Sequence, residues 1–266
     1  IPKLKAYAGE EYFIRFTLKQ PKDNKAYKRG YEYDFAEFAL DMPTFRKQEL
    51  KPYEKTELYL AEQSSEKVEA IEVEELKIEN DNSKLKVYND EVTIVFDLKS
   101  GQITSLSCNG EKVLGAAPSM CFWREPTNND MADNNAANYW ENIGLDKLTR
   151  TLSTVDYKQN DKYTVNIDVV SAYRNHRNEK LFDVVQTIII YCTGDVIIDN
   201  EIMVSDMVNN VPRVGMIFEV PKSFFAAQWF GLSGETYMDR KASGRYGTYK
   251  SSTSDLSYAY ETAQES

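Results

Sequence analysis

Val92-Thr-Ile-Val-Phe-Asp-Leu-Lys-Ser-Gly-Gln-Ile-Thr-Ser-Leu106 carries the clearest secondary-structure signal in this chain. Its first half alternates apolar and polar residues with the period of two that is typical of a half-buried β-strand. The polar run Lys99-Ser-Gly-Gln102 then favours a turn, and Ile103 and Leu106 begin a return strand. The pattern therefore predicts an antiparallel hairpin.

Similar signals recur along the chain. Asn109-Gly110 predicts a second tight hairpin, because both residues tolerate the positive φ angles of a type I′ turn. A short helix is expected only within residues 132–148, and without regular strand–helix alternation a (β/α)8 barrel is excluded from this stretch. Further strands are expected at residues 11–19, 31–40, 163–170, 181–191, 196–204 and 214–220. The chain is therefore expected to be all-β.

Composition narrows the classes of partner. The 266 residues carry a net charge of −10, with a pI of about 4.9, so nucleic acid is an unfavourable partner. The most apolar run, Thr187 to Cys192, is too short to span a bilayer. Neither nucleic acid nor a membrane is expected to bind this chain.

Few residues carry the signature of catalysis. Cys108, Cys121 and Cys192 form no CxxC pair, which argues against a disulfide framework or a zinc site. His176 is the single histidine and lies in a polar segment, so a Ser/His/Asp triad is excluded. Motifs for phosphate, dinucleotide or HExxH zinc binding are also absent from the sequence. We therefore assign no catalytic residue, metal ligand or cofactor to this chain.

Phe122-Trp-Arg-Glu-Pro-Thr-Asn-Asn-Asp130, followed by a polar run to Trp140, is the most distinctive segment. Aromatic faces beside amide and carboxylate groups are used in sugar recognition. An alternative is a surface turn held by its own Asx side chains, and the residues alone favour it. In either case we expect Phe122, Trp123 and Trp140 to pack, and Arg124 to pair with a carboxylate or carbonyl at the base of the loop.

The same segment resembles the Arg-x-Pro-x-Asp-Asn-Asp stretch of the C-terminal domain in family 2 β-galactosidases of the long bacterial type. Three further stretches resemble that family in the same order: Gly30 to Phe38 with Pro43, Phe96 to Leu106, and Pro212-Arg-Val-Gly215 with Trp229-Phe-Gly231 and Glu235 to Arg240. The chain departs from the family pattern at Asn128, where Asp is usual, at Ala132, where Gly is frequent, and at Ser233-Gly234.

The resemblance implies a domain organisation. Residues 1–42 would be the last strands of an immunoglobulin-like domain, residues 43–75 a linker or edge segment, and residues 76–266 an incomplete terminal β-sandwich of the galactose-mutarotase-like type. The catalytic barrel, with both glutamates, would lie upstream in the same chain. A divalent cation in the parent enzyme would bind elsewhere, and a homo-oligomer is possible.

The resemblance also implies a role. This region would be a non-catalytic part of a retaining β-galactosidase that shapes the active-site mouth and contacts a galactoside, with Asn129 to Asn138 as a mobile loop facing that mouth. Localisation stays open between the bacterial cytoplasm and periplasm. The candidate substrate-proximal residues are Arg124, Asn128, Asn129, Asp130, Asp133 and Trp140.

Two alternatives remain. A mutarotase-like epimerase would need an acid and a base at the sugar, and His176 is a poor candidate for either. An independent carbohydrate-binding module would need two or more exposed aromatic side chains, for which Trp123, Trp140 and Trp229 are the candidates.

Overall fold

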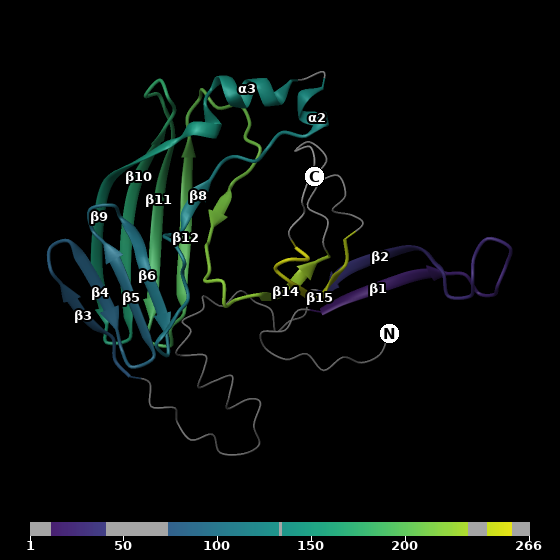
Figure 1. Cartoon of the computed structure of the whole chain (residues 1–266), viewed down its shortest axis with the longest axis horizontal. Coiled ribbons are helices and arrows are strands. Elements are labelled where there is room, and N and C mark those ends of the chain that lie inside the picture. The colour runs from purple at the N-terminus through teal and green to yellow at the C-terminus, as the bar shows by residue number, and fades with distance from the viewer. Residues whose placement is uncertain (1–11, 41–73, 133–134, 234–243, 257–266) are drawn as a thin grey trace, which may run out of the picture. The chain divides into compact units, whose positions relative to one another are not determined.

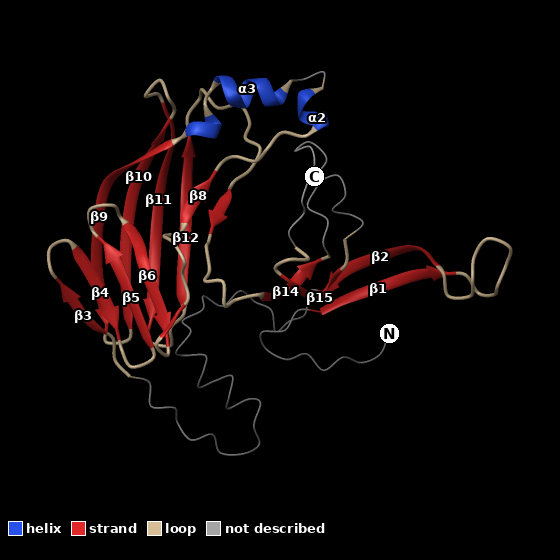
Figure 2. Ribbon diagram, viewed as in Figure 1, coloured by secondary structure: helices blue, strands red, loops and turns tan. Residues whose placement is uncertain are grey.

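The computed structural model describes residues 12–40, 74–132, 135–233 and 244–256 (Figure 1). The chain divides into two compact units. The first unit comprises Ile1–Lys51 and Phe225–Ser257, and the second comprises Pro52–Phe224 and Tyr258–Ser266. Nearly all regular structure is β-strand, as the red ribbons of Figure 2 show, so the predicted all-β class is confirmed.

Two antiparallel sheets dominate the second unit. One sheet has the order β3-β4-β5-β6-β7 and the other the order β12-β11-β10-β9. The five strands of the first are β3 (Lys77–Asn80), β4 (Lys84–Tyr88), β5 (Val92–Asp97), β6 (Gln102–Cys108) and β7 (Glu111–Lys112). The four of the second are β9 (Thr149–Asp161), β10 (Thr164–Arg174), β11 (Lys180–Tyr191) and β12 (Val196–Val204).

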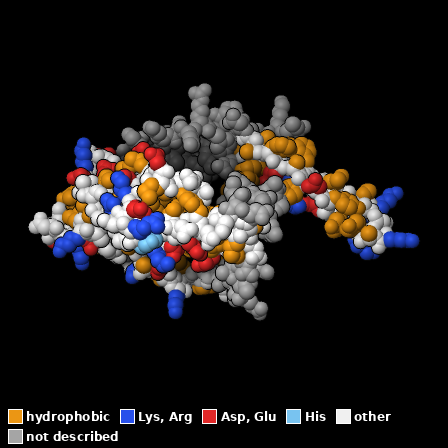
Figure 3. Space-filling model, turned by 90° about the horizontal axis from the view of Figure 1, so that it is seen from above, with side chains coloured by type: hydrophobic (Ala, Val, Ile, Leu, Met, Phe, Trp, Pro, Cys, Tyr) orange, Lys and Arg blue, Asp and Glu red, His pale blue; other side chains and the backbone are white. Residues whose placement is uncertain are grey.

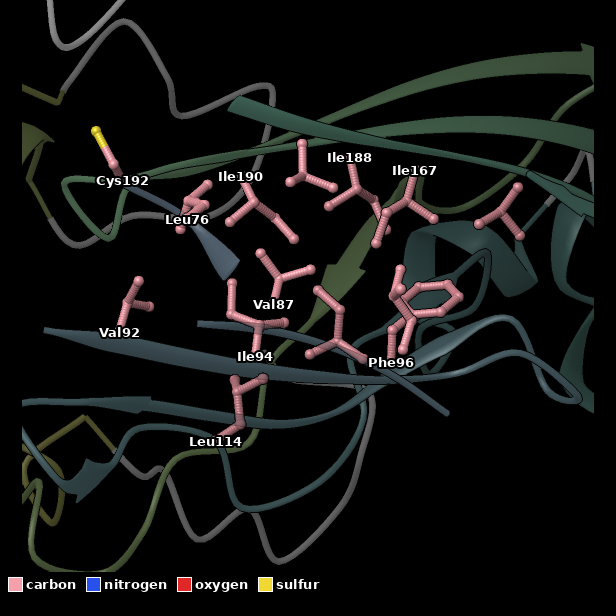
Figure 4. Close-up of a cluster of buried hydrophobic side chains, with 14 residues drawn as sticks. Leu76, Val87, Val92, Ile94, Phe96, Leu114, Ile167, Ile188, Ile190 and Cys192 are labelled. Carbon is pink, nitrogen blue, oxygen red and sulfur yellow. The ribbon is translucent and has the colours of Figure 1, made fainter. Parts of the chain in front are cut away.

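The main core lies between these two sheets (Figure 4). Ile94 and Phe96 of β5 are fully buried, and they belong to one cluster with Val165, Ile167 and Ile188 of the facing sheet. The alternation that starts at Val92 therefore directs every second side chain into this core. Burying a large aliphatic or aromatic side chain contributes about 1.5–3 kcal/mol, so this cluster is the main stabilising element of the unit.

A second cluster lies at one end of the sandwich and positions the candidate site. Leu181, Phe182, Val184 and Leu145 are its most buried members, and Phe122 and Trp140 also belong to it. The short elements around it are β8 (Ser119–Cys121), which pairs with β13 (Gly215–Ile217), the one-turn helix α2 (Asn128–Met131), α3 (Ala136–Asn142) and the 3₁₀ turn η2 (Leu145–Lys147).

The described residues of the first unit form two hairpins, β1 (Tyr12–Lys19) with β2 (Glu32–Leu40), and β14 (Ala226–Leu232) with β15 (Tyr246–Ser252). The Phe13 ring stacks on Tyr246 with centroids 4.4 Å apart. The Arg15 guanidinium donates to Glu37 and to the Tyr246 carbonyl, at 2.6 and 2.7 Å. These contacts join the hairpins although Arg15 and Tyr246 lie 231 positions apart in the sequence.

Most predicted strands are present. Asn109 and Gly110 have φ angles of +49° and +77° between β6 and β7, as the type I′ turn requires. The strand expected at 163–170 continues to Arg174, whereas the one expected at 214–220 is reduced to Gly215–Ile217. α3 lies within the stretch where a helix was expected. The domain limits at residues 42 and 76 stay a prediction, and the segment between them lies mostly outside the described residues.

Candidate functional site

Phe122 anchors the segment that contains the candidate residues. Its ring stacks on Phe182 of β11, with centroids 4.1 Å apart and an interplanar angle of 5°, and meets Tyr173 edge-on at 5.3 Å. Trp123 packs against the same cluster. The expectation that Phe122 and Trp123 pack is confirmed. The segment that follows β8 is therefore anchored in the buried cluster.

Arg124 and Asp130 form the centre of the site. Arg124 Nη1 and Nη2 donate to the two carboxylate oxygens of Asp130, at 2.6 and 3.2 Å. Nη1 also donates to the Glu125 carbonyl at 3.1 Å. The predicted pairing of Arg124 with a carboxylate or carbonyl is therefore confirmed.

A capping box locks the same carboxylate onto the start of α2. Thr127 is the N-cap, and its backbone N–H and its hydroxyl donate to Asp130 Oδ2 at 2.7 and 2.9 Å. The hydrogen bond from Arg124, supported by those from Thr127, holds the pKa of the Asp130 carboxyl below its ordinary value. Thr127-x-x-Asp130 is a sequence signature of a helix start, and the sequence interpretation missed it.

Trp140 forms the inner wall of the site. Its side chain is 4% exposed, and its Nε1 donates to Asn210 Oδ1 at 2.5 Å. The Arg124 guanidinium lies 5.4 Å from the Trp140 ring centroid, within cation–π range. The neighbouring Tyr139 hydroxyl donates to the Met207 carbonyl and accepts from the Asn209 N–H. Two hydrogen-bonded side chains thus tie α3 to the segment before β13.

Asn128 and Asn129 are exposed in the first turn of α2. Arg124 joins the other two residues into one group, because it donates to Asp130 and makes the cation–π contact with Trp140. The structure therefore brings five of the six candidate residues together. Asp133, the sixth, lies outside the described residues. The stretch Asn129–Asn138 contains the end of α2 and the start of α3 rather than loop alone, because Thr127 and Asn135 each cap a helix with a side-chain oxygen.

The arrangement offers hydrogen bonds more readily than acid–base chemistry. Asp130 is held by Arg124 and Thr127, whereas retaining and inverting glycosidases use a pair of free carboxyl groups that flank the scissile bond. Within the described residues, no cluster of three or more His, Cys, Asp and Glu side chains could hold a metal ion. Two exposed amides remain as donors and acceptors for a polar ligand.

The residues named for the alternative functions either lie outside the candidate site or are at least half-buried. His176 is exposed in the turn between β10 and β11. Trp140 is buried, while Trp123 and Trp229 are half-buried, and Trp229 stacks on Tyr249 at 5.6 Å. The three cysteines are free thiols. In the described part of the chain no helix has the length and apolarity needed to cross a membrane.

The comparisons with known proteins all point to the same family. A profile of the family described as "Beta galactosidase small chain" matches residues 88–266, which include the whole candidate site. A β-galactosidase of Alteromonas mediterranea is 27% identical over 97% of this chain, and one of Priestia megaterium is 21% identical over 96%. A β-galactosidase of Kluyveromyces lactis is 25% identical over 71% of the chain.

The chain spans about a quarter of the length of the relatives it matches. The matched region covers 25% of the Alteromonas protein, 22% of the Priestia protein and 19% of the Kluyveromyces protein. Most of each relative therefore has no counterpart in this chain.

Proposed function

Because the chain belongs to the β-galactosidase small chain family, we propose that it is a non-catalytic C-terminal region of a retaining β-galactosidase. The two catalytic glutamates would come from a barrel elsewhere in the enzyme. This region would help to close the active-site mouth and would contact the galactoside. The resemblance to family 2 enzymes with a mutarotase-like terminal sandwich belongs to this proposal.

One observation supports the proposal most directly. Two exposed amides, Asn128 and Asn129, stand on a helical turn that Arg124, Thr127 and Asp130 hold in one geometry. Amides both donate and accept, as neighbouring sugar hydroxyls require. A pre-ordered frame lowers the entropy lost on binding, so two such groups can contribute to affinity.

The first experiment uses a full-length β-galactosidase that contains this chain. Replacing Asn128 and Asn129 together by Ala should lower kcat/KM for a galactoside about tenfold, because one or two hydrogen bonds to substrate are lost. Asn142→Ala, at the exposed end of α3, is the matched control and should leave kcat/KM unchanged. Equal values of kcat/KM for the double variant and the control would mean that the segment is only a surface turn.

A second experiment uses the 266-residue chain alone. The purified chain should not hydrolyse a chromogenic β-galactoside, because the catalytic carboxylates are assigned to a part that it lacks. The control is a mock preparation from host cells that do not express the chain, purified identically, which reports contaminating host activity. Turnover by the chain above that background would overturn the non-catalytic assignment.

A further inference from the structure

The tip of the β1–β2 hairpin gathers tyrosines and basic residues on an otherwise acidic chain. We call residues 20–31 together with Tyr33 the tyrosine tip. Tyr27, Tyr31 and Tyr33 are 39%, 47% and 45% exposed. Figure 3 shows cationic side chains at the far end of this hairpin, beyond a group of hydrophobic ones. The basic residues of the tip are Lys22, Lys25, Lys28 and Arg29, and Asp23 is its one acidic residue.

The three rings form one compact group. Tyr27 and Tyr31 stack with centroids 4.2 Å apart, and Tyr33 meets both edge-on at 5.3 Å. The Tyr33 hydroxyl donates to Gln20 Oε1 at 2.7 Å. Stacked and edge-on rings cover parts of one another, so the tip is a projecting knob rather than a flat platform for a sugar ring. Tyrosine and arginine in such a position are typical of the residues that dominate binding energy in protein interfaces.

Hydrogen bonds hold the tip in a single conformation. Asp23 accepts from the Arg29 N–H at 2.8 Å and from Lys28 Nζ at 2.9 Å. Asn24 Oδ1 accepts from the N–H groups of Ala26 and Tyr27. A loop that is already ordered loses little conformational entropy when it docks.

A complementary surface lies on the second unit, on the outer face of the sheet β9–β12. Asp156 of β9 lies directly opposite Asp168 of β10, and Thr187 of β11 connects that row to Asp199 of β12. Glu201 lies on the same face, and so does one exposed cation, Lys158 of β9, two residues from Asp156. We call these four exposed carboxylates the acidic face. Like charges directly opposite each other in a sheet are destabilising, and none of the four has a cation within 4.0 Å in the described part of the chain.

We propose that the tyrosine tip of one copy of this chain docks on the acidic face of a second copy. Three of the four basic residues of the tip, Lys22, Lys25 and Arg29, form no ion pair among the described residues, so they are free to face Asp156, Asp168 and Asp199. Exposed apolar surface on the same sheet face, including Ile197 at 36%, gives the tyrosine rings a place to pack. Both surfaces occur once per chain, so the contact is head-to-tail and forms a ring or an open chain of copies.

Sedimentation and light scattering test this contact at several concentrations of the 266-residue chain. We expect reversible self-association that weakens between about 50 mM and 500 mM salt, because surface charges are then screened. A tip variant, Lys22→Glu with Lys25→Glu and Arg29→Glu, should raise the dissociation constant about tenfold or more. A face variant, Asp156→Lys with Asp168→Lys and Asp199→Lys, should do the same.

Mixing the two variants is the decisive measurement. Each variant alone has two surfaces of the same sign, whereas the mixture pairs the acidic tip with the basic face and the basic tip with the acidic face. Association should therefore return in the mixture. Lys84→Glu with Lys99→Glu and Lys112→Glu, which changes the charge equally on the other sheet, is the matched control and should associate like the unmodified chain. Circular dichroism confirms that each variant folds.

Three outcomes would overturn the proposal. The first is a chain that stays monomeric over the whole concentration range. The second is association that is indifferent to salt and to both variants, which would place the contact on apolar strand edges. The third is a mixture that stays dissociated although both variants are folded.

Discussion

Asp130 is the residue whose charge state matters most for the candidate site. Its pKa in the folded chain lies below the ordinary value of 3.8, mainly because Arg124 donates to it. A depressed pKa contributes stability that is complete above the unfolded-state pKa and is lost as the pH falls through the folded-state pKa. The contribution should therefore be complete at neutral pH, begin to fall near pH 3.8 and vanish only below the folded-state pKa.

The variant Asp130→Asn tests this linkage. Its deficit in unfolding free energy against the unmodified chain should be largest near neutral pH and should shrink as the pH falls below about 4. Urea unfolding at a series of pH values measures the difference. Glu125→Gln, an exposed neighbour, is the control and should show no such trend. A deficit that is constant across the range would mean that the ionised carboxylate is not what stabilises the turn.

Two glycines allow the energetic cost of backbone strain to be measured apart from the cost of close packing. Gly101 has a φ of +65°, and a Cβ there would lie 2.6 Å from Leu152 Cδ1. Gly110 has a φ of +77° with no atom within 4 Å of that position. Gly110→Ala should cost about 1–2 kcal/mol for the left-handed conformation alone, and Gly101→Ala should cost more because the side chain of Leu152 must also shift. Equal losses in urea unfolding would show that the sandwich yields freely at the β5–β6 turn.

Among the elements, strands rich in Val, Ile and Phe could be predicted, whereas a strand of mostly exposed polar residues could not. β5 alternates buried and half-buried side chains because one of its faces lies in the core, and β10, β11 and β12 each carry several Val and Ile residues. β9 is the longest strand, yet most of its residues are exposed and polar, as in Thr154, Asp156 and Lys158. Its place in the sheet comes from pairing with β10, which a local pattern does not reveal.

The candidate site, too, could be predicted from the sequence only in part. The pairing of Arg124 and the packing of Trp140 followed from residue type and were expected. Helix α2 depends on one capping box, whose Thr-x-x-Asp signature was visible but not used. The bonds from Tyr139 and Trp140 to residues 207–210 link positions about 70 residues apart, so they required the fold itself.

The two units of the molecule differ sharply in burial. None of the residues in β1, β2, β14 and β15 is buried, and Phe16 and Leu18 are 59% and 64% exposed. By contrast, most residues of β10 are buried in the sandwich. Stability follows apolar burial, so the two units should differ in the free energy needed to open them.

Amide hydrogen exchange read by mass spectrometry tests that difference. Peptides from β10 and β11 should exchange slowest, because their amides open only when the sandwich core opens. Peptides from β1, β2, β14 and β15 should exchange much faster, and together, because Arg15 and Phe13 join the two hairpins into one small cooperative unit. Phe13→Ala should speed exchange in β14 and β15 as well as in β1, while β10 and β11 stay protected. Uniform protection across both units, or an effect of Phe13→Ala that stops at its own hairpin, would contradict this division of the molecule.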